Sequence, residues 1–302
     1  MLWWQLAIHI KNNTALNLTL EKQQRHNFME TITFIGSGNM ANSIIGGLIA
    51  QGYQPHAITA CDPNERALEK LSEEFGINTS TDNVKAAANT NVIVLAVKPQ
   101  ILKGVALDLA LSVSNNPKKP IVISIVAGIT APLLSQWLGS RTAIVRCMPN
   151  TPALVQEGAA GLYANEHVSV SQKEIAEKLM RAVGSVTWLS SEELIDAVTA
   201  VSGSGPAYFF LLMEAMIDAG IKQGLTLDQA SQLTLQTALG AAKLALKSDV
   251  RVNELRRRVT SPGGTTEQAI LSFEAAGFRT IVDNALTACA ERSKAMGAEL
   301  EE

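Results

Sequence analysis

Two loops of small residues carry most of the chemical information in this sequence, and the first follows an apolar segment. Gly36, Gly38 and Ala41 have the spacing G-x-G-x-x-A after the β-branched run 31–35 and before an apolar helical pattern. The first glycine permits a tight turn, the second lets backbone approach a pyrophosphate, and the small third residue lets the helix pack closely. Because the N-terminus of such a helix offers unpaired N–H groups to phosphates, the segment predicts a dinucleotide site.

Asp62 ends the second expected strand, at the position that usually selects the dinucleotide. A carboxylate suits the ribose 2′-hydroxyl of NAD and repels the 2′-phosphate of NADP, whereas Arg66, one helical turn later, suits that phosphate. The residues alone leave this choice open. Lys98 lies in Val97-Lys98-Pro99-Gln100, at the end of another apolar strand. Such a loop is expected to face the cofactor, and the alternative is a solvated loop cation.

The second loop, Ser261-Pro262-Gly263-Gly264-Thr265-Thr266, precedes a helical pattern. Two glycines before a helix N-terminus make a nest of backbone donors that suits a small carboxylate, and three hydroxyls add neutral donors. The alternative is an ordinary helix cap by Thr265, which leaves the glycine pair unexplained. Ser202-Gly203-Ser204-Gly205-Pro206 is another small-residue loop, for which close helix packing is the alternative.

The sequence shows no residue pattern that would serve as a general base. It has no His–Asp pair, no lysine in an apolar helix and no cluster of carboxylates. Alcohol oxidation needs a base, and carbonyl reduction needs a strong proton donor. A protonated imine needs neither, because the electrophile already carries its charge, and positioning it against a nicotinamide supplies most of the catalysis.

Composition limits the remaining classes of function. The 302 residues are 47% hydrophobic and 18% charged, and the net charge of −3 with scattered cations disfavours nucleic-acid binding. The uncharged stretch 120–140 contains polar and turn residues, which argues against a membrane span. Three widely spaced cysteines predict reduced thiols in a cytosolic protein. Four isolated histidines predict no metal site.

The first half of the chain alternates apolar strand patterns with helical ones. Continuous apolar strands of this kind predict a parallel sheet covered on both faces. The expected strands are 31–35, 57–61, 91–97, 120–126 and 142–147, with 158–163 and 186–189 added at the edge. We expect a Rossmann domain over residues 29–189. Residues 1–28 lack the features of a signal peptide and are expected to be a disordered or non-native extension.

The second half, 190–302, has only helical signals. Capping-box patterns at Ser190-x-x-Glu193, Thr226-x-x-Gln229 and Thr265-x-x-Gln268 predict helix starts, and a last helix is expected over 278–296. Residues 200–213 and 233–246 are apolar around too much of the helix for a surface position. Such helices are buried either inside a large core or against a partner subunit, and we expect the second, in an all-helical domain.

Five motifs, in this order, resemble those of pyrroline-5-carboxylate reductase. They are Gly36-Ser37-Gly38-Asn39-Met40-Ala41, Ala96-Val97-Lys98-Pro99, Arg146-Cys147-Met148-Pro149-Asn150-Thr151-Pro152, Ser202-Gly203-Ser204-Gly205-Pro206-Ala207-Tyr208 and Ser261-Pro262-Gly263-Gly264-Thr265-Thr266. The resemblance implies reduction of 1-pyrroline-5-carboxylate to L-proline by hydride transfer from NAD(P)H. It also implies a homodimer, often assembled into a decamer, while the cysteine usage predicts a cytoplasmic location.

The resemblance assigns roles to particular residues. The substrate would be held by Ser261, Gly264, Thr265 and Thr266, and Thr266 would place its hydroxyl near the ring nitrogen as the catalytic residue. The family commonly prefers NADPH, which conflicts with Asp62, and NADH remains possible. The dinucleotide would contact Gly36, Ser37, Gly38, Asn39, Met40, Asp62, Asn83, Ala96, Val97, Lys98 and Pro99.

Two other functions compete with this assignment. β-Hydroxyacid dehydrogenases share the domain order and use a lysine and an asparagine in the first helix between domains; here those positions hold Phe209 and Met213. The proton shuttle of that family would be lost. A non-catalytic NADP(H) sensor is the other alternative, and the intact loop from Ser261 to Thr266 argues against it, because a sensor needs no second small-molecule site.

Overall fold

The computed structural model of the chain describes residues 30–301, and the expected extension 1–28 lies outside these residues. Within them one sheet of eight strands has the order β3-β2-β1-β4-β5-β6-β7-β8. All neighbouring pairs are parallel except β6 and β7. The strands are β1 (Ile32–Ile35), β2 (Ile58–Cys61), β3 (Asn78–Ser80), β4 (Val92–Leu95), β5 (Ile121–Ser124), β6 (Ala143–Met148), β7 (Gly158–Ala164) and β8 (Gly184–Trp188).

Helices cover both faces of this sheet, as the continuous apolar strands predict. Strand β4 shows why: Val92 and Val94 join one core cluster, and Ile93 and Leu95 join the other. One face packs against α2 (Asn39–Ala50), α3 (Glu65–Phe75) and α7 (Val170–Arg181), and the other against α4 (Asn83–Ala87), α5 (Pro99–Ser114) and α6 (Ala131–Leu138). The strand order reverses between β1 and β4, where such sheets bind ligands.

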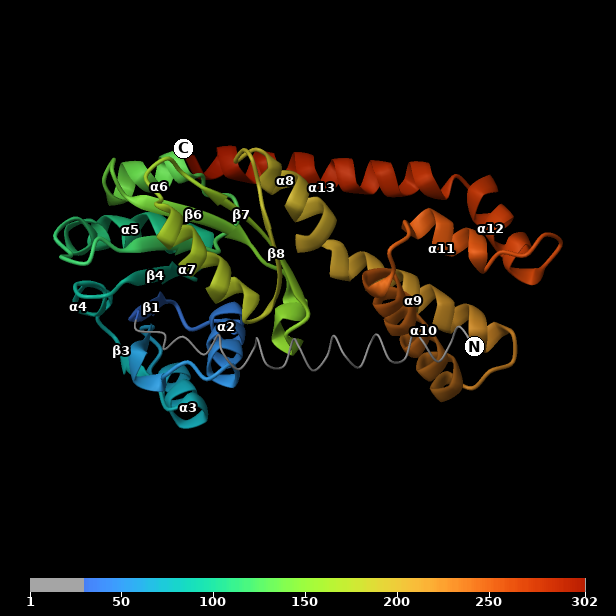
Figure 1. Ribbon diagram of the computed structural model, residues 1–302, viewed down its shortest axis with the longest axis horizontal. Helices are drawn as coiled ribbons and strands as arrows, with labels where there is room; N and C mark the ends of the chain where they lie inside the picture. Colours follow the sequence, from blue (N-terminus) through green and yellow to red (C-terminus); the bar gives the residue numbers. More distant parts are fainter. Residues whose placement is uncertain (1–29, 302) are drawn as a thin grey trace.

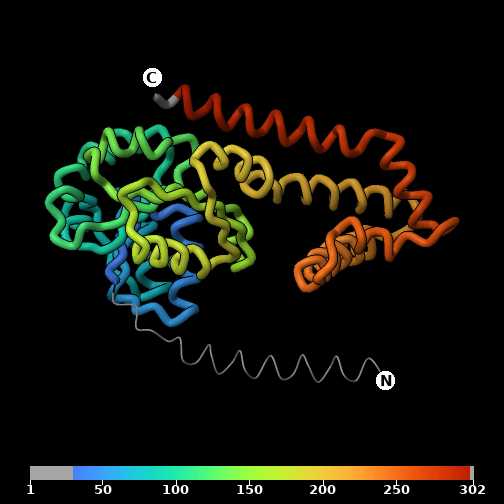
Figure 2. The backbone as a smooth tube through the Cα atoms, turned by 45° about the horizontal axis from the view of Figure 1, so that its top comes forward, coloured from blue at the N-terminus to red at the C-terminus, as the bar shows by residue number. Residues whose placement is uncertain are grey.

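The second half is helical and extends away from the sheet (Figures 1 and 2). Helices α9 and α13 connect the sheet to the distant group formed by α10, α11 and α12. Near its C-terminal end α13 returns to the sheet, where Gly297 approaches Gly128 in the loop after β5. These helices are α8 (Leu194–Val198), a π-helical turn (Thr199–Gly203), α9 (Gly205–Lys222), α10 (Leu227–Lys247), α11 (Val252–Arg258), α12 (Thr265–Ala275) and α13 (Phe278–Glu301).

Helix α9 leaves large apolar side chains uncovered. Phe209, Phe210 and Leu211 are 63%, 62% and 67% exposed. By length and composition alone, the helical stretch 194–222 is apolar enough to cross a membrane. Only 11% of its most apolar window is buried within this chain, so most of this apolar surface is uncovered. A single chain therefore leaves an apolar surface of the kind that a partner subunit covers, as expected for this half of the sequence.

Of three expected helix starts in the second half, one is confirmed and two differ in the structure. The capping box at Thr226 is present and opens α10. The box expected at Ser190 is wrong, because α8 begins at Leu194 without a side-chain cap. The preceding turn instead carries Glu192, whose carboxylate accepts from the N–H of Ala131, the first residue of α6, at 2.6 Å. Thr265 is the first residue of α12 rather than its cap, which is Gly264.

The segment Ser202–Pro206 is not a loop. The chain passes from α8 through a π-helical turn directly into α9, and the N–H of Ser204 bonds to the carbonyl of Thr199 at 2.8 Å. Small residues make this possible, because a Cβ on Gly203 would lie 2.7 Å from the methyl carbon of Met148 at the end of β6. The close-packing interpretation therefore accounts for Gly203.

Candidate active site

The glycine turn lies at the carboxyl end of β1, beside the end of β4. Gly36 has a φ of +103°, and its N–H bonds to the carbonyl of Cys61 at 2.8 Å. A Cβ at Gly36 would lie 2.6 Å from the carbonyl oxygen of Ala96. The structure thus brings two of the expected cofactor segments, Gly36–Met40 and Ala96–Pro99, into contact at the switch point of the sheet.

The start of α2 presents donors without internal partners. Gly38 is the N-cap residue, makes no side-chain cap and has nothing within 4 Å of where a Cβ would be. The first intrahelical bond joins the N–H of Asn42 to the carbonyl of Gly38. The N–H groups of Asn39, Met40 and Ala41 are therefore available to a phosphate, with the helix dipole in favour. This geometry fits the pyrophosphate of a dinucleotide.

Asp62 points at the glycine turn rather than outward. Its Oδ2 accepts from the N–H of Ser37 at 3.0 Å and from the Ser37 hydroxyl at 2.8 Å, and its Oδ1 accepts from the N–H of Asn64 at 2.9 Å. Both carboxylate oxygens thus already hold the turn and the start of α3. Three of the roughly four acceptor positions of the carboxylate are therefore used within the chain, which leaves Asp62 less capacity to read the ribose 2′-hydroxyl of NAD.

The other expected cofactor residues surround this turn. Asn83 is the first residue of α4, just after β3, which pairs with β2 at Cys61. Lys98 is exposed and is the N-cap residue of α5, with Pro99 as the first helical residue. Arg66 is exposed in the first turn of α3, and no acidic side chain pairs with it among the described residues.

The expected substrate loop is a tight turn leading into α12. Gly263 has a φ of +71°, and the N–H of Gly264 bonds to the carbonyl of Ser261 at 3.0 Å. The N–H groups of Thr265 and Thr266 make no hydrogen bond within the described part of the chain. Two adjacent free donors at a helix N-terminus can take the two oxygens of a carboxylate.

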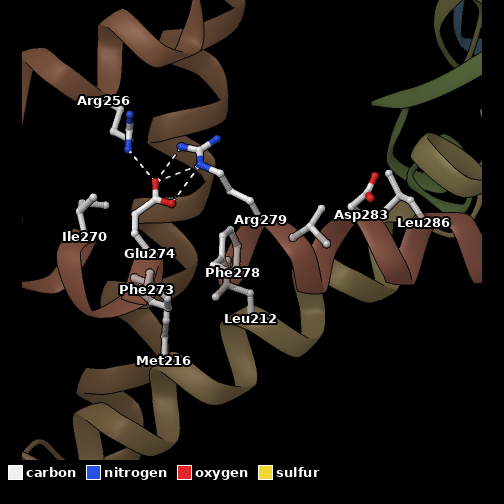
Figure 3. Close-up of a pocket in the computed structure, with 11 residues that line it drawn as sticks. Leu212, Met216, Arg256, Ile270, Phe273, Glu274, Phe278, Arg279, Asp283 and Leu286 are labelled. Atoms are coloured by element: carbon white, nitrogen blue, oxygen red, sulfur yellow. Dashed lines mark hydrogen bonds and ion pairs between the residues drawn. The ribbon is translucent and has the colours of Figure 1, made fainter. Parts of the chain in front are cut away.

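These two parts of the expected site do not meet within one chain. The glycine turn lies in the sheet half, whereas the loop between α11 and α12 lies at the opposite end of the molecule (Figures 1 and 2). The same helical end contains a hollow of about 600 Å³ between α9, α12 and α13 (Figure 3). Three of its four charged side chains are paired with one another, since Glu274 bonds to Arg256 and Arg279, and the fourth is Asp283. The remaining lining is mainly apolar, which suits another protein surface better than a dinucleotide.

The segment Arg146–Pro152 supports the site rather than lining it. Arg146 is 7% exposed and pairs with Glu192 at 2.7 Å. Asn150 donates to the carbonyl of Ser202 at 3.0 Å and accepts from the N–H of Ala159 at 2.8 Å. These contacts fasten the π-helical turn and the start of the helical half to β6 and β7. Sequence reasoning missed Glu192, because its partners lie 46 and 61 residues away.

The two cysteine thiols of the sheet, Cys61 on β2 and Cys147 on β6, are held in their neutral forms. Burial raises the pKa of the Cys61 thiol to about 12, with the nearby Asp82 and Asp62 adding to the effect, and burial raises the pKa of Cys147 further. Neither is a ready nucleophile. Among residues 30–301 no group of three or more His, Cys, Asp or Glu side chains could hold a metal ion.

Comparisons with known proteins agree on one family. A family model described as "Pyrroline-5-carboxylate reductase dimerisation" matches residues 192–296, and one described as "NADP oxidoreductase coenzyme F420-dependent" matches residues 31–128. The pyrroline-5-carboxylate reductase of Pseudomonas aeruginosa is 54% identical over 89% of this chain and 97% of its own length. The Escherichia coli enzyme of the same name is 38% identical over 87% and 97%.

Solved structures give the same result. A pyrroline-5-carboxylate reductase from Coxiella burnetii superposes with a TM-score of 0.85 at 49% identity, covering 88% of this chain and 98% of that one. Plasmodium falciparum pyrroline carboxylate reductase with NADP bound has a TM-score of 0.78 at 32% identity, covering 89% and 98%.

Proposed function

The chain belongs to the pyrroline-5-carboxylate reductase family, and we propose that it reduces 1-pyrroline-5-carboxylate to L-proline with a hydride from NADPH, the last step of proline biosynthesis. The observation that carries this proposal is the pairing of a phosphate-binding glycine turn with a second loop whose free N–H groups suit a small carboxylate. The family places both motifs in this order along one chain.

NADP(H) is the cofactor that fits these residues best. The N–H groups of Asn39 to Ala41 would take the pyrophosphate, and Gly38 leaves room for the backbone to approach it. Asp62 is turned inward, so Arg66 is the charged side chain available to a 2′-phosphate. Bound NADPH would supply the hydride. The relative from Plasmodium falciparum was solved with NADP bound, which supports this choice over NADH.

The loop before α12 would orient the substrate. The N–H groups of Thr265 and Thr266 would donate to the carboxylate oxygens, and the Thr266 hydroxyl would lie beside the ring nitrogen. Gly264 shapes the loop rather than donating to the ligand, whereas the Ser261 hydroxyl makes no hydrogen bond in the described part of the chain and would add a donor for the substrate. A Cβ at Gly264 would lie 3.0 Å from the carbonyl oxygen of Ser261, which already accepts the Gly264 N–H. Larger residues at position 264 would therefore distort the carboxylate site.

This arrangement can reduce an imine without a general base. The protonated ring nitrogen makes C5 electrophilic, so the protein needs only to hold C5 against the nicotinamide and exclude water. The β-hydroxyacid dehydrogenase alternative needs a proton shuttle, and α9 carries Phe209 and Met213 where that family has lysine and asparagine. The buried thiols of Cys61 and Cys147 stay protonated at neutral pH and offer no substitute.

A homodimer explains how the two halves of the site come together. The helical region matches the dimerisation family, and the exposed apolar face of α9 needs a cover. We propose that the substrate loop of one subunit faces the glycine turn of its partner, because the two lie at opposite ends of a single chain. We further propose that dimers assemble into a decamer and that the protein acts in the cytoplasm, in line with its three free cysteines.

We also propose three segments: an extension over 1–28, a Rossmann domain over 29–189 and a helical substrate-binding and dimerisation domain over 190–302. The last strand of the sheet ends at Trp188, and the described residues beyond 190 form helices and their connections, which supports the second boundary. The match to the dimerisation family begins at residue 192, close to this boundary.

A direct assay tests the function. Purified protein should oxidise NADPH, followed at 340 nm, only after 1-pyrroline-5-carboxylate is added, and proline should appear in equal amount. The control replaces the substrate by a β-hydroxyacid with NADP. Absence of turnover with pyrroline-5-carboxylate, under conditions where the Escherichia coli enzyme works, would refute the assignment, and turnover of the hydroxyacid would favour the dehydrogenase alternative.

A further inference from the structure

One carboxylate of the chain itself already lies in the proposed substrate loop. Glu267, in the first turn of α12, accepts a hydrogen bond from the N–H of Gly263 through Oε2 at 2.7 Å. Gly263 is the left-handed residue of the turn, with a φ of +71°. The glutamate therefore reaches back over the helix N-terminus to the residue before the N-cap, much as the third residue of a capping box does.

This contact changes which donors of the loop remain free. The N–H of Gly263 is taken by Glu267, and the N–H of Gly264 is taken by the Ser261 carbonyl. Among the amides from 263 to 266, only those of Thr265 and Thr266 have no partner in the described part of the chain. A ligand carboxylate is thereby restricted to one adjacent pair of donors.

We propose that Glu267 is a positioning residue of the reductase. By holding Gly263 it keeps the turn in one conformation and directs the substrate carboxylate to the amides of Thr265 and Thr266. This inference rests on the proposed function of the loop. It adds a role for a side chain that neither contacts the cofactor turn nor belongs to the motif from Ser261 to Thr266.

Glu267 would act by limiting the positions that the substrate carboxylate can take along the amides at the N-terminus of α12. With Glu267 absent, the amides of Gly263, Thr265 and Thr266 would compete for one carboxylate, and the substrate could bind in more than one position along the helix N-terminus. Each such shift moves C5 relative to the nicotinamide, and small misplacements lower the rate strongly. The cofactor turn lies in the other half of the chain, so NADPH binding should not depend on Glu267.

Two substitutions separate the hydrogen bond from the charge. Glu267→Gln keeps a side-chain carbonyl oxygen that can accept the Gly263 N–H, whereas Glu267→Ala removes the acceptor. We expect Glu267→Ala to raise the KM for pyrroline-5-carboxylate at least about 5-fold, the scale of one lost hydrogen bond, with the KM for NADPH unchanged. Glu267→Gln should stay within about 2-fold of wild type. Glu69→Ala, an exposed glutamate on α3, is the matched control.

Amide hydrogen exchange supplies an independent readout. The Gly263 N–H should be protected in the wild type and in Glu267→Gln, and should exchange faster in Glu267→Ala. An unchanged substrate KM in Glu267→Ala would overturn the proposal, as would an equal rise in both KM values or a Gln variant as impaired as the Ala variant. A wild type inactive on pyrroline-5-carboxylate would instead refute the proposed function, while the exchange experiment would still report on the Glu267 contact.

Discussion

At the scale of single residues, the site depends on how polar groups are shared between the chain and its ligands. Asp62 is the clearest case, because its three hydrogen bonds to Ser37 and Asn64 make it part of the glycine turn. Cofactor choice then falls to side chains that are still free. In the substrate loop the amides of Gly263 and Gly264 are bonded within the chain, so the amides of Thr265 and Thr266 and the Thr266 hydroxyl remain for the ligand.

Substitution of Arg66 tests the choice of cofactor. Arg66→Gln removes the charge proposed to meet the 2′-phosphate, so the KM for NADPH should rise roughly 10- to 100-fold, the range for a lost charge-assisted hydrogen bond. The KM for NADH should stay the same, because NADH lacks that phosphate. Initial rates with both cofactors measure this, and Lys70→Gln on the same helix is the control. Equal effects on both cofactors would show that Arg66 does not read the phosphate.

Substitution of Thr266 tests the proposed catalytic hydroxyl. Thr266→Ala should lower kcat on the order of 100-fold, the scale reported for removal of one positioned donor, while NADPH binding stays normal. The backbone amide remains in place, so substrate binding should weaken less than turnover. Steady-state rates and a fluorescence titration with NADPH give the two quantities. If turnover is unchanged, Thr266 has no part in the chemistry.

The buried thiols give a prediction for high pH. Burial raises the pKa of Cys61 to about 12 and that of Cys147 further, whereas an unfolded thiol ionises near about 8.5. Above that pH the unfolded state has lost protons that the folded state retains, so stability should fall as pH rises from about 8.5 toward 12. Denaturant titrations across this range test it, with Cys147→Ser and Cys61→Ser as comparisons. A flat profile would contradict it.

At the scale of elements, the connection between the sheet and the helical half is built from buried polar contacts. Glu192, in the turn before α8, joins the start of α6 and the side chain of Arg146 on β6. Asn150 joins the π-helical turn to β7. Ser293 on α13 donates to Asp196 on α8 at 2.7 Å. Together these bonds set the direction in which α9 and α13 leave the sheet.

Loss of Glu192 should weaken this connection. Glu192→Ala leaves Arg146 buried without its partner, and breaking such a pair costs about 3 kcal/mol of the free energy of unfolding. Urea denaturation measures the difference, with Glu193→Ala at the adjacent exposed glutamate as the control. A loss no larger than that of the control would mean that Glu192 contributes little to the junction.

At the scale of the whole molecule, the exposed apolar surface decides the assembly. A single chain leaves Phe209, Phe210 and Leu211 more than 60% exposed on a helix that joins its two halves. It also separates the glycine turn from the substrate loop (Figure 1). A partner subunit that covers the apolar surface of α9 can also bring its substrate loop to the glycine turn. The dimer is therefore expected to be both the stable and the active form.

A charge on α9 should therefore abolish assembly and activity together. Phe210→Glu places a carboxylate in the expected interface, so we expect monomers by analytical ultracentrifugation and no measurable turnover. Leu111→Glu alters a residue on α5 that is 74% exposed, and it should leave the dimer and the activity intact. A Phe210→Glu protein that stays dimeric and active would place the interface elsewhere.

The sequence by itself determined the elements and their chemical types. Apolar strands of four to seven residues, the glycine turn and the Thr226 capping box depend on neighbours along the chain, and each appears close to its expected position. The short polar elements β3, α4 and α11 were not foreseen, because they are stabilised by the elements beside them rather than by a pattern of their own. The expected loop at Ser202–Pro206 proved helical for the same reason.

Only the tertiary structure decided how polar groups are shared. Asp62 turns toward Ser37, Glu192 reaches Arg146, and the two parts of the proposed site lie at opposite ends of the chain. Residue type and spacing give the groups that are able to bind, but a hydrogen bond depends on distance and direction between groups that the fold brings together. For this reason the sequence identified the family and its loops, and the structure showed which donors and acceptors within them remain free.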